Sequence, residues 1–371
     1  MSQSRYFIAL MQEILTSVNN NYEDNYDHLR YGPLNRSRKP TSLKQKVKDK
    51  LNEKGYFHRS NINYAVTAIA DGTWIKDFEY LYELLEDDES RALLVKLVAY
   101  RLLGHEKVRL PLSTPEYWKS IEEIESHQSE TDLIEIDFMD FKLKLTDLSF
   151  LNIPLKLYYT AFGTNIDFIV RQYEFHRNGV HIQADPGDVV IDGGGCFGDT
   201  ALYFSDKIKG EGTTYVFEFI PDNIAILRKN IGLNPRHASS IRLVENPLWS
   251  HSEEEVFYLS NGPGSRVSFQ PFEGYSGKTT TLSIDDFVDR QRLEKVDFIK
   301  MDIEGAEIKA LYGAEETLRK YKPKLSIALY HSTADFEVIP RYLKNLDLGY
   351  RFYLSHSTIF SEETMLFAKA D

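Results

Sequence analysis

The first group of residues with the types and spacing for chemistry lies between Val189 and Thr200. This stretch reads VVIDGGGCFGDT: an apolar run ends at an acid, and three glycines follow. Glycine lets a backbone approach a ligand closely, and a helix that begins near Asp199 would offer its free N–H groups to an anion. The stretch predicts a strand, a tight turn and a helix N-terminus that together bind a cofactor.

Two classes of cofactor fit such a turn, and Asp192 distinguishes them. The spacing Gly193-x-Gly195-x-x-Gly198 matches the dinucleotide fingerprint. A dinucleotide would bring a pyrophosphate close to Asp192, and the carboxylate would repel it. S-adenosylmethionine carries an ammonium and a sulfonium, and opposite charges about 4 Å apart gain roughly 4 kcal/mol at an intermediate dielectric. The acid favours S-adenosylmethionine, and a glycine turn without any ligand remains the third alternative.

The second group of chemical residues follows a later strand that ends at Asp302. Lys300 and Asp302 are two residues apart on this strand, so they point to the same face. Glu304 and Glu307 come next, at the end of the strand where open α/β sheets bind ligands. His331 ends the following strand, and a neutral imidazole suits removal of a hydroxyl proton near neutral pH. The predicted catalytic residues are His331, Asp302, Lys300 and Glu304.

Other roles remain open for some of these residues. Asp302, Glu304 and His331 could bind a divalent metal through carboxylate oxygens and one imidazole, although no metal is included in the prediction. His356, near the same edge of the sheet, is a second candidate base. Cys196, the single cysteine, is a weak candidate nucleophile, and packing is its expected role.

Two further residues at strand ends could contact the cofactor. Glu218 ends the second strand, where an acid can accept hydrogen bonds from both ribose hydroxyls, or can cap the next helix. Asn246 follows the third strand and could face the adenine, or could form a turn with Pro247. The predicted cofactor contacts around the glycine turn are Asp192, Gly193, Gly194, Gly195 and Asp199.

Strands and helices alternate from the glycine turn to the end of the chain. Repeated β-α-β units predict a doubly wound, mostly parallel sheet. The last two strands, 350–354 and 365–368, have no long helix between them and predict a hairpin at one edge. One helix is expected over 304–318 and another over 164–176, and a mobile loop is expected over the glycine- and proline-rich residues 260–278.

The part of the chain before this sheet has a different pattern. Leucines recur at helical spacing over 62–104, which predicts helices that pack on one another. Alternating residues over 133–138 and 141–145 predict a β-hairpin. We therefore expect a mostly helical N-terminal domain over 1–130, a possible substrate cap, and a cofactor-binding domain with a leading hairpin over 131–371. A basic cluster between Arg36 and Lys50 is either a solvated face or a clamp for an anionic substrate.

Composition limits the possible partners. The chain has 371 residues, with 44 basic and 56 acidic side chains and a net charge of −12, which argues against general nucleic-acid binding. The single cysteine excludes an internal disulfide. No apolar stretch is long enough to span a bilayer, and the first residues do not have the pattern of a signal peptide. The expected location is cytoplasmic.

Successive blocks of the C-terminal half resemble one known family. The blocks are GDVVIDGGGCFGDTALYF, YVFEFIPDNIAILRKNI, TTTLSIDDF, VDFIKMDIEGAE and ALYHST. In this order they resemble the FkbM-type methyltransferases, which are class I S-adenosylmethionine-dependent O-methyltransferases. The resemblance covers residues 170–371, and IKMDIEGAE is its most specific part. The family's first motif usually has one glycine followed by alanine and asparagine, so Gly193-Gly194-Gly195-Cys196 departs from it.

The resemblance implies a seven-stranded, Rossmann-like sheet with one antiparallel strand and a cofactor contact by Tyr173. It also implies methylation of a hydroxyl on a saccharide or secondary metabolite. From the residues themselves we expect in-line transfer of the methyl group, with His331 as the base. Two other functions are kept as alternatives. One is an NAD-dependent oxidoreductase with the same glycine spacing, and the other is a non-catalytic protein that binds a partner through residues 1–130 on an inherited cofactor fold.

Overall fold

The chain divides into two compact units in the computed structural model, which describes residues 4–32 and 73–370. Unit 1 comprises Met1–Pro115 and Thr358–Glu362, and unit 2 comprises Glu116–Ser357 and Glu363–Asp371. The division falls earlier than the boundary predicted at residue 130, because Ser120 on helix α7 (Pro115–Ser126) donates a 2.6 Å hydrogen bond to Asn165 Oδ1 in unit 2. The basic cluster lies outside the described residues.

The described part of unit 1 is helical. Its helices are α1 (Arg5–Ser17), α2 (His28–Tyr31), α5 (Thr73–Leu84) and α6 (Asp88–Leu103). Asp87 caps α6 by accepting a hydrogen bond from the Ser90 amide, and α6 ends at Gly104 with φ 86°, a conformation that favours glycine. The predicted helices at 62–104 are thus present from residue 73 on, and residues 62–72 lie outside the described chain.

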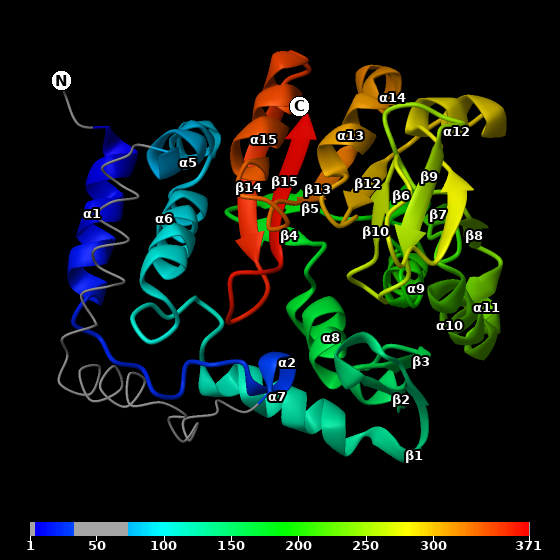
Figure 1. The fold of residues 1–371 in the computed structure, drawn as a ribbon, viewed down its shortest axis with the longest axis horizontal. Coiled ribbons are helices and arrows are strands. Elements are labelled where there is room, and N and C mark those ends of the chain that lie inside the picture. The colour runs from blue at the N-terminus through cyan, green and yellow to red at the C-terminus, as the bar shows by residue number, and fades with distance from the viewer. Residues whose placement is uncertain (1–3, 33–72, 371) are drawn as a thin grey trace. The chain divides into compact units, whose positions relative to one another are not determined.

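Unit 2 is built on one sheet of seven strands (Figure 1). Their spatial order is β14 (Tyr350–His356), β15 (Thr364–Ala370), β13 (Lys324–Ala328), β12 (Phe298–Met301), β6 (Val189–Gly193), β7 (Thr213–Phe217) and β8 (Ile241–Val244). Only β15 among them is antiparallel to its neighbours, and β14 and β15 form a hairpin at the edge. The predicted doubly wound, mostly parallel sheet with one antiparallel strand is confirmed.

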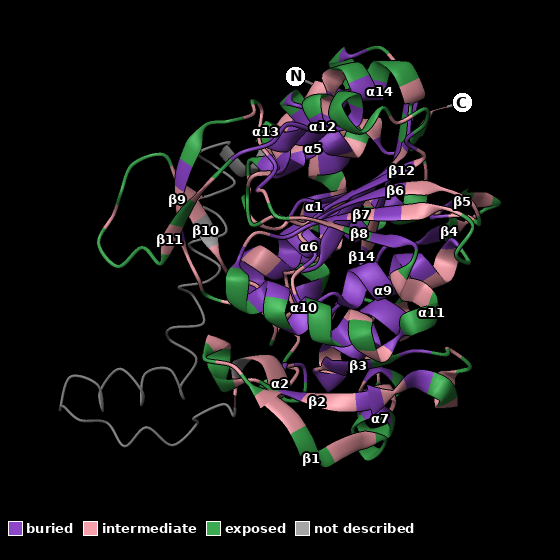
Figure 2. Ribbon diagram, turned by 90° about the vertical axis from the view of Figure 1, so that its right-hand side faces the viewer, coloured by how far each residue is buried: buried purple, intermediate pink, exposed green. Residues whose placement is uncertain are grey.

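Helices cover both faces of this sheet, which is buried in the middle of the unit (Figure 2). One face carries α9 (Asp199–Lys207), α10 (Pro221–Leu233) and α11 (Pro235–Ala238). The opposite face carries α12 (Ile284–Gln291), α13 (Glu307–Tyr312), α14 (Glu315–Tyr321) and α15 (Asp335–Asn345). Every residue of the central strand β12 is buried, so Lys300 on this strand must find its partners inside the protein.

Smaller sheets surround the main one. The predicted hairpin is present as β1 (Gln128–Glu135) and β2 (Lys142–Asp147), and β3 (Lys156–Tyr159) adds a third antiparallel strand. β4 (Phe175–Arg177) pairs with β5 (Val180–Ile182). The prediction of a mobile loop over 260–278 is wrong in part, because this segment contains strands. β10 (Arg266–Ser268) and β11 (Gly277–Thr280) both pair with β9 (Glu255–Leu259). Backbone pairing with β9 overrides the turn-forming composition of this segment.

Two predicted helices are also interrupted. The helix expected over 304–318 begins only at Glu307 and is divided at Gly313, where a Cβ would lie 2.3 Å from the Trp249 carbonyl oxygen. The helix expected over 164–176 is a short α8 (Ala161–Thr164) continued by a π-helical turn, η3 (Asn165–Val170). It ends at Arg171, whose φ of 61° is left-handed. Both interruptions lie next to candidate site residues, since Glu304 precedes one and Asp167 belongs to the other.

Candidate functional site

The glycine turn after β6 is required by packing between strands. A Cβ on Gly194, which has φ 88°, would lie 2.0 Å from the Asp302 carbonyl oxygen. A Cβ on Gly195 would lie 2.1 Å from Val216 Cγ1, and one on Gly193 would lie 2.9 Å from a Leu248 methyl group. The protein's own neighbours therefore account for all three glycines, and their contact with a cofactor stays a prediction.

Asp192, at the end of β6, is paired inside the protein. It is fully buried, with Oδ1 3.1 Å from Lys300 Nζ and Oδ2 accepting a 2.6 Å hydrogen bond from Thr200 Oγ1. Lys300 Nζ also donates to the carbonyl oxygens of Gly193 at 3.0 Å and Gly194 at 2.7 Å. The Asp192 charge is thus neutralised by Lys300, and the sequence argument for a cationic cofactor cannot depend on this carboxylate alone.

Lys300 is a permanent cation in this arrangement. Burial lowers the pKa of its ammonium, but the carboxylates of Asp192 and Asp302 more than offset this, and the pKa lies above its ordinary value. Its Nζ donates hydrogen bonds to two carbonyl oxygens of the glycine turn and forms an ion pair with Asp192. Because these contacts hold the ammonium inside the protein, they favour a positioning role for Lys300 over the predicted catalytic one.

Asp302 lies where β6, β12 and β13 end together. Tyr330 donates a 2.7 Å hydrogen bond to its Oδ1, and Tyr173 donates one of 3.2 Å to its Oδ2. The Tyr173 ring also lies 5.3 Å from Lys300 Nζ, so the residue implied by the family resemblance is part of this cluster. Burial raises the pKa of Asp302, and the charge of His331 opposes the shift.

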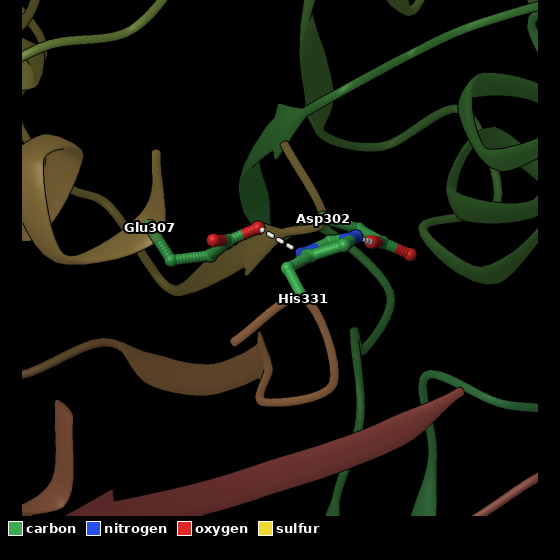
Figure 3. A group of neighbouring side chains, drawn as sticks. All are labelled: Asp302, Glu307 and His331. Carbon is green, nitrogen blue, oxygen red and sulfur yellow. Dashed lines mark hydrogen bonds and ion pairs between the residues drawn. The ribbon is translucent and has the colours of Figure 1, made fainter. Parts of the chain in front are cut away.

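His331 lies between two carboxylates (Figure 3). Its Nδ1 is 2.9 Å from Glu307 Oε1, and its Nε2 is 3.5 Å from Asp302 Oδ1 and 3.8 Å from Glu304 Oε2. Burial lowers the pKa of the imidazole, but the Glu307 hydrogen bond and the three negative charges raise it to about 10. The ring therefore carries a proton on both nitrogens near neutral pH and lacks the lone pair that a base needs.

Asp302, Glu307 and His331 have side chains of the types that commonly bind metal ions. Ligand atoms of Asp302, Glu307 and His331 all lie within 4.8 Å of one another. However, the imidazole fills the space between the carboxylates, with one nitrogen facing each (Figure 3). A doubly protonated ring donates a hydrogen bond to Glu307 through Nδ1. Its Nε2 has no hydrogen-bond partner but lies 3.5 Å from Asp302 Oδ1, so the positive charge of the ring accounts for the grouping of these acids.

Glu304 differs from the other acids because it is partly open to solvent. It has a left-handed φ of 58°, and its side chain is 40% exposed, compared with 9% for His331. Partial burial, together with the charges of Asp302 and Glu307, raises the pKa of the Glu304 carboxyl to about 8, although His331 opposes the shift. A carboxyl with such a pKa exchanges protons near physiological pH.

A second pair of acids lies on the other side of the glycine turn. Asp199 begins α9 and is 4% exposed, and Asp167 on η3 is 3% exposed. Burial and the neighbouring Asp199 raise the pKa of Asp167 well above its ordinary value, and burial raises that of Asp199 to about 6. Asp167 Oδ2 and Asp199 Oδ1 have no hydrogen-bond partner.

Asp167 was missed by the sequence analysis. The only sign of Asp167 in the sequence is that it is an acid within the apolar run Ile166–Val170. In a regular amphipathic helix, such an acid would be expected on the solvent-exposed face. The π-helical turn directs this segment inward instead, and Ile166, Asp167 and Phe168 are all buried. The Tyr159 hydroxyl interacts electrostatically with both acids of the pair.

The remaining candidates are engaged with nearby backbone or packing. Glu218 Oε1 accepts hydrogen bonds from the amides of Phe219 at 2.6 Å and Ile220 at 2.8 Å, in the loop that leads into α10. Asn246 donates a 2.9 Å hydrogen bond to the Thr280 carbonyl oxygen, which is not the contact expected of a turn with Pro247. The cofactor contacts of both residues stay predictions.

His356 and Cys196 also have structural surroundings. His356 is buried, and its Nδ1 lies 2.9 Å from Thr364 Oγ1 on the paired strand. Burial, and next the charge of Asp199, raise the pKa of the Cys196 thiol well above its ordinary value. Since the thiolate is the nucleophilic form, this environment does not activate the cysteine.

Negative charge predominates at this edge of the sheet. Among the described residues, the carboxyls of the site interact electrostatically with one another and with the cations Lys300 and His331. The seven acids are Asp167, Asp192, Asp199, Asp302, Glu304, Glu307 and Glu363. Such a surplus favours a cationic guest and opposes a pyrophosphate.

In a doubly wound sheet, the carboxyl ends of the strands, where these acids lie, are the edge that binds ligands. Residues 192–352 match the family model described as the methyltransferase FkbM domain. This part of the chain contains the glycine turn and the Asp302–His331 cluster, so both groups lie in the region that is similar to the methyltransferase FkbM domain.

One curated relative matches part of the same region. The 2-O-methyltransferase NoeI of Sinorhizobium fredii (strain NBRC 101917 / NGR234) is 28% identical over 162 residues, which is 39% of this chain and 65% of that protein. The chain therefore spans just under two thirds of the length of this relative.

Solved structures with the same general fold are more distant. The methyltransferase FkbM from Methylobacillus flagellatus KT is 19% identical, with a TM-score of 0.49 over 82% of this chain and 60% of that one. A SAM-dependent O-methyltransferase from Thermotoga maritima is 12% identical, with a TM-score of 0.35 over 60% of this chain and 69% of that one. The fold class rests on the chain's own strand order.

No helix within residues 4–32 and 73–370 has both the length and the apolar character needed to cross a membrane.

Proposed function

We propose that this protein is an S-adenosylmethionine-dependent O-methyltransferase that acts on a hydroxyl of a saccharide or secondary metabolite. The observation that carries the proposal is the surplus of carboxyls at the edge of the sheet, seven acids with two cations. A sulfonium and an ammonium would relieve this charge, whereas the pyrophosphate of NAD would add to it. The similarity of residues 192–352 to the methyltransferase FkbM domain supports the same cofactor, and the name of the relative NoeI supports an oxygen acceptor.

The residues around the glycine turn fit such a cofactor. Asp167 and Asp199 each keep a buried oxygen without a hydrogen-bond donor, and Glu218 lies at the end of β7 where a ribose is held in related sheets. When bound, the cofactor would supply an activated methyl group. The protein's task is then to hold the acceptor oxygen in line, and such alignment can contribute roughly 7–11 kcal/mol to lowering a barrier.

The proton of the acceptor hydroxyl needs a base, and Glu304 suits this role better than His331. His331 is already protonated on both nitrogens near neutral pH, since the pKa of its imidazole is raised to about 10 by Glu307 and Asp302 after burial has lowered it. Asp302 is held by two tyrosine hydroxyls. Glu304 is the exposed member of the cluster, and burial with neighbouring charges raises its pKa to about 8.

Transfer of a labelled methyl group tests the proposal directly. The protein is incubated with methyl-labelled S-adenosylmethionine and a panel of saccharides and hydroxylated metabolites, and the product is identified by mass spectrometry. Label on a hydroxyl oxygen is the expected result. Calorimetry with S-adenosylhomocysteine and with NAD separates the alternatives: NAD binding alone would indicate an oxidoreductase, and binding of neither would favour the non-catalytic protein.

The pH profile tests Glu304. Wild-type kcat/KM should rise with pH through about 8, as the carboxyl ionises. Glu304→Gln should lower kcat by roughly 10²–10⁴-fold and abolish this rise, while Glu294→Gln, an exposed acid on the loop after α12, should change neither. His331→Gln should move the rise to higher pH, because the imidazolium lowers the pKa of Glu304. A Glu304→Gln variant with the wild-type rate would remove this residue from the mechanism.

A further inference from the structure

We propose that Asp167 and Asp199 bind the α-ammonium group of S-adenosylmethionine, in place of Asp192. This inference rests on the proposed function and deepens it, because it assigns the residues that recognise the amino-acid part of the cofactor. The fold alone does not explain why these two acids are buried. The sequence analysis had assigned the attraction of the cofactor's positive charge to Asp192.

Asp192 is already occupied by protein donors. Lys300 Nζ lies 3.1 Å from its Oδ1, and Thr200 donates a 2.6 Å hydrogen bond to its Oδ2. Asp192 and Lys300 are also partners in register across β6 and β12, so the sheet itself holds the pair together. An ammonium ligand would have to compete with a lysine that cannot move away.

Asp192 Oδ1 also lacks a hydrogen-bond partner, but Lys300 Nζ forms an ion pair with it at 3.1 Å. Asp167 and Asp199 differ from Asp192 because neither forms an ion pair within the described part of the chain. Asp167 Oδ2 and Asp199 Oδ1 have no hydrogen-bond partner, although the residues are only 3% and 4% exposed. An unpartnered buried acceptor costs free energy in the empty protein. An ammonium has three N–H donors, which is enough to satisfy one oxygen of each acid and a third acceptor.

Rigid elements hold both acids in place. Asp199 is the first residue of α9, directly after the glycine turn and at the carboxyl end of β6, where open α/β sheets bind ligands. Asp167 is carried by the π-helical turn η3, a type of distortion frequently found at functional sites.

Tyr159 on β3 completes the group. Its hydroxyl interacts electrostatically with both Asp167 and Asp199. Its ring occupies a space left by Gly163, where a Cβ would lie 2.5 Å from Tyr159 Cζ. Three separate elements, β3, η3 and α9, thus direct polar groups to one point. The cation Lys300 interacts electrostatically with both acids, but its N–H groups are used elsewhere.

Two ligands that differ in the amino-acid part provide the test. S-adenosylhomocysteine carries the α-ammonium, and 5′-methylthioadenosine lacks it. Calorimetry on the full chain should give a higher affinity for S-adenosylhomocysteine. Asp199→Asn and Asp167→Asn should each reduce that preference by about 10- to 100-fold, the range for losing a hydrogen bond to a charged group. Their affinity for 5′-methylthioadenosine should stay within about twofold of wild type. Asp206→Asn, on the same helix, is the matched control and should change neither affinity.

The outcomes separate this inference from the proposed function. If the wild-type chain binds neither ligand, the proposed function fails and the ammonium site fails with it. If both ligands bind but the variants leave the preference unchanged, the two acids are structural and this inference alone is overturned. Loss of the preference in Asp192→Asn but not in Asp199→Asn would also overturn it. Circular dichroism and thermal unfolding confirm that each variant is folded, and the two variants test the site independently.

Discussion

Replacing Lys300 with methionine tests how the glycine turn is held. Lys300 and Asp192 are 1% and 0% exposed, so the variant would leave a carboxylate buried without its cation. Removing one partner of a buried ion pair typically costs 3–5 kcal/mol. For a unit of about 250 residues, each kcal/mol corresponds to about 2–4 °C, so we expect Tm to fall by roughly 6–20 °C.

Urea unfolding followed by fluorescence measures this loss, and a double-mutant cycle with Asp192→Asn assigns it. The double variant Lys300→Met/Asp192→Asn should recover part of the loss, because it removes both charges, and the coupling should be about 1–3 kcal/mol. Lys278→Met is the matched control. Lys278 pairs with Glu255 on the surface, where the side chains are 61% and 53% exposed, so its loss of stability should be much smaller than that of Lys300→Met.

Two results would refute the description of Lys300 as the cation that holds the turn. One is a loss of stability no larger than that of the Lys278→Met control. The other is additive single variants, since residues that do not interact show no coupling energy.

Three further predictions follow from the charges and the close packing of the site. The folded-state pKa of Asp199 is raised to about 6 from 3.8, so the folded protein binds the proton more tightly and stability should fall as pH rises from about 4 to 6. The Asp199→Asn variant should therefore be more stable than wild type at neutral pH, by roughly 3 kcal/mol. Urea titrations at several pH values should show this advantage disappearing near pH 4. A variant as stable as wild type at both pH values would contradict the prediction. Treatment with EDTA should leave methyl transfer unchanged, because the positive charge of His331 offsets the charges of Asp302 and Glu307. Activity that is lost with EDTA and restored only by added Mn²⁺ would assign these residues to a metal. Gly194→Ala should cost roughly 2–5 kcal/mol from its positive φ and its clash with the Asp302 carbonyl. Gly179→Ala, with φ 79° but open space around it, should cost only about 1–2 kcal/mol, and equal losses would exclude the clash.

Local patterns in the sequence were sufficient for the main architecture. Apolar runs that end at acids and alternate with helical segments predicted the parallel sheet, and the resemblance predicted its single antiparallel strand. The same patterns correctly predicted that Asp302, Glu304 and His331 lie close together, because the carboxyl ends of parallel strands meet at one edge of the sheet. Segments without such a pattern were predicted less well, as in β10 and β11, where pairing with β9 decides the conformation.

The charge state of the site was decided only by the tertiary structure. The sequence does not reveal that β12 lies beside β6, which is why the pairing of Lys300 with Asp192 was not foreseen. In the same way, the proton on His331 depends on three carboxylates that the fold gathers around it. Hydrophobic periodicity is a local property that can be read along the chain, whereas electrostatic interaction depends on distance and burial. Those are determined only when residues far apart in the sequence come together.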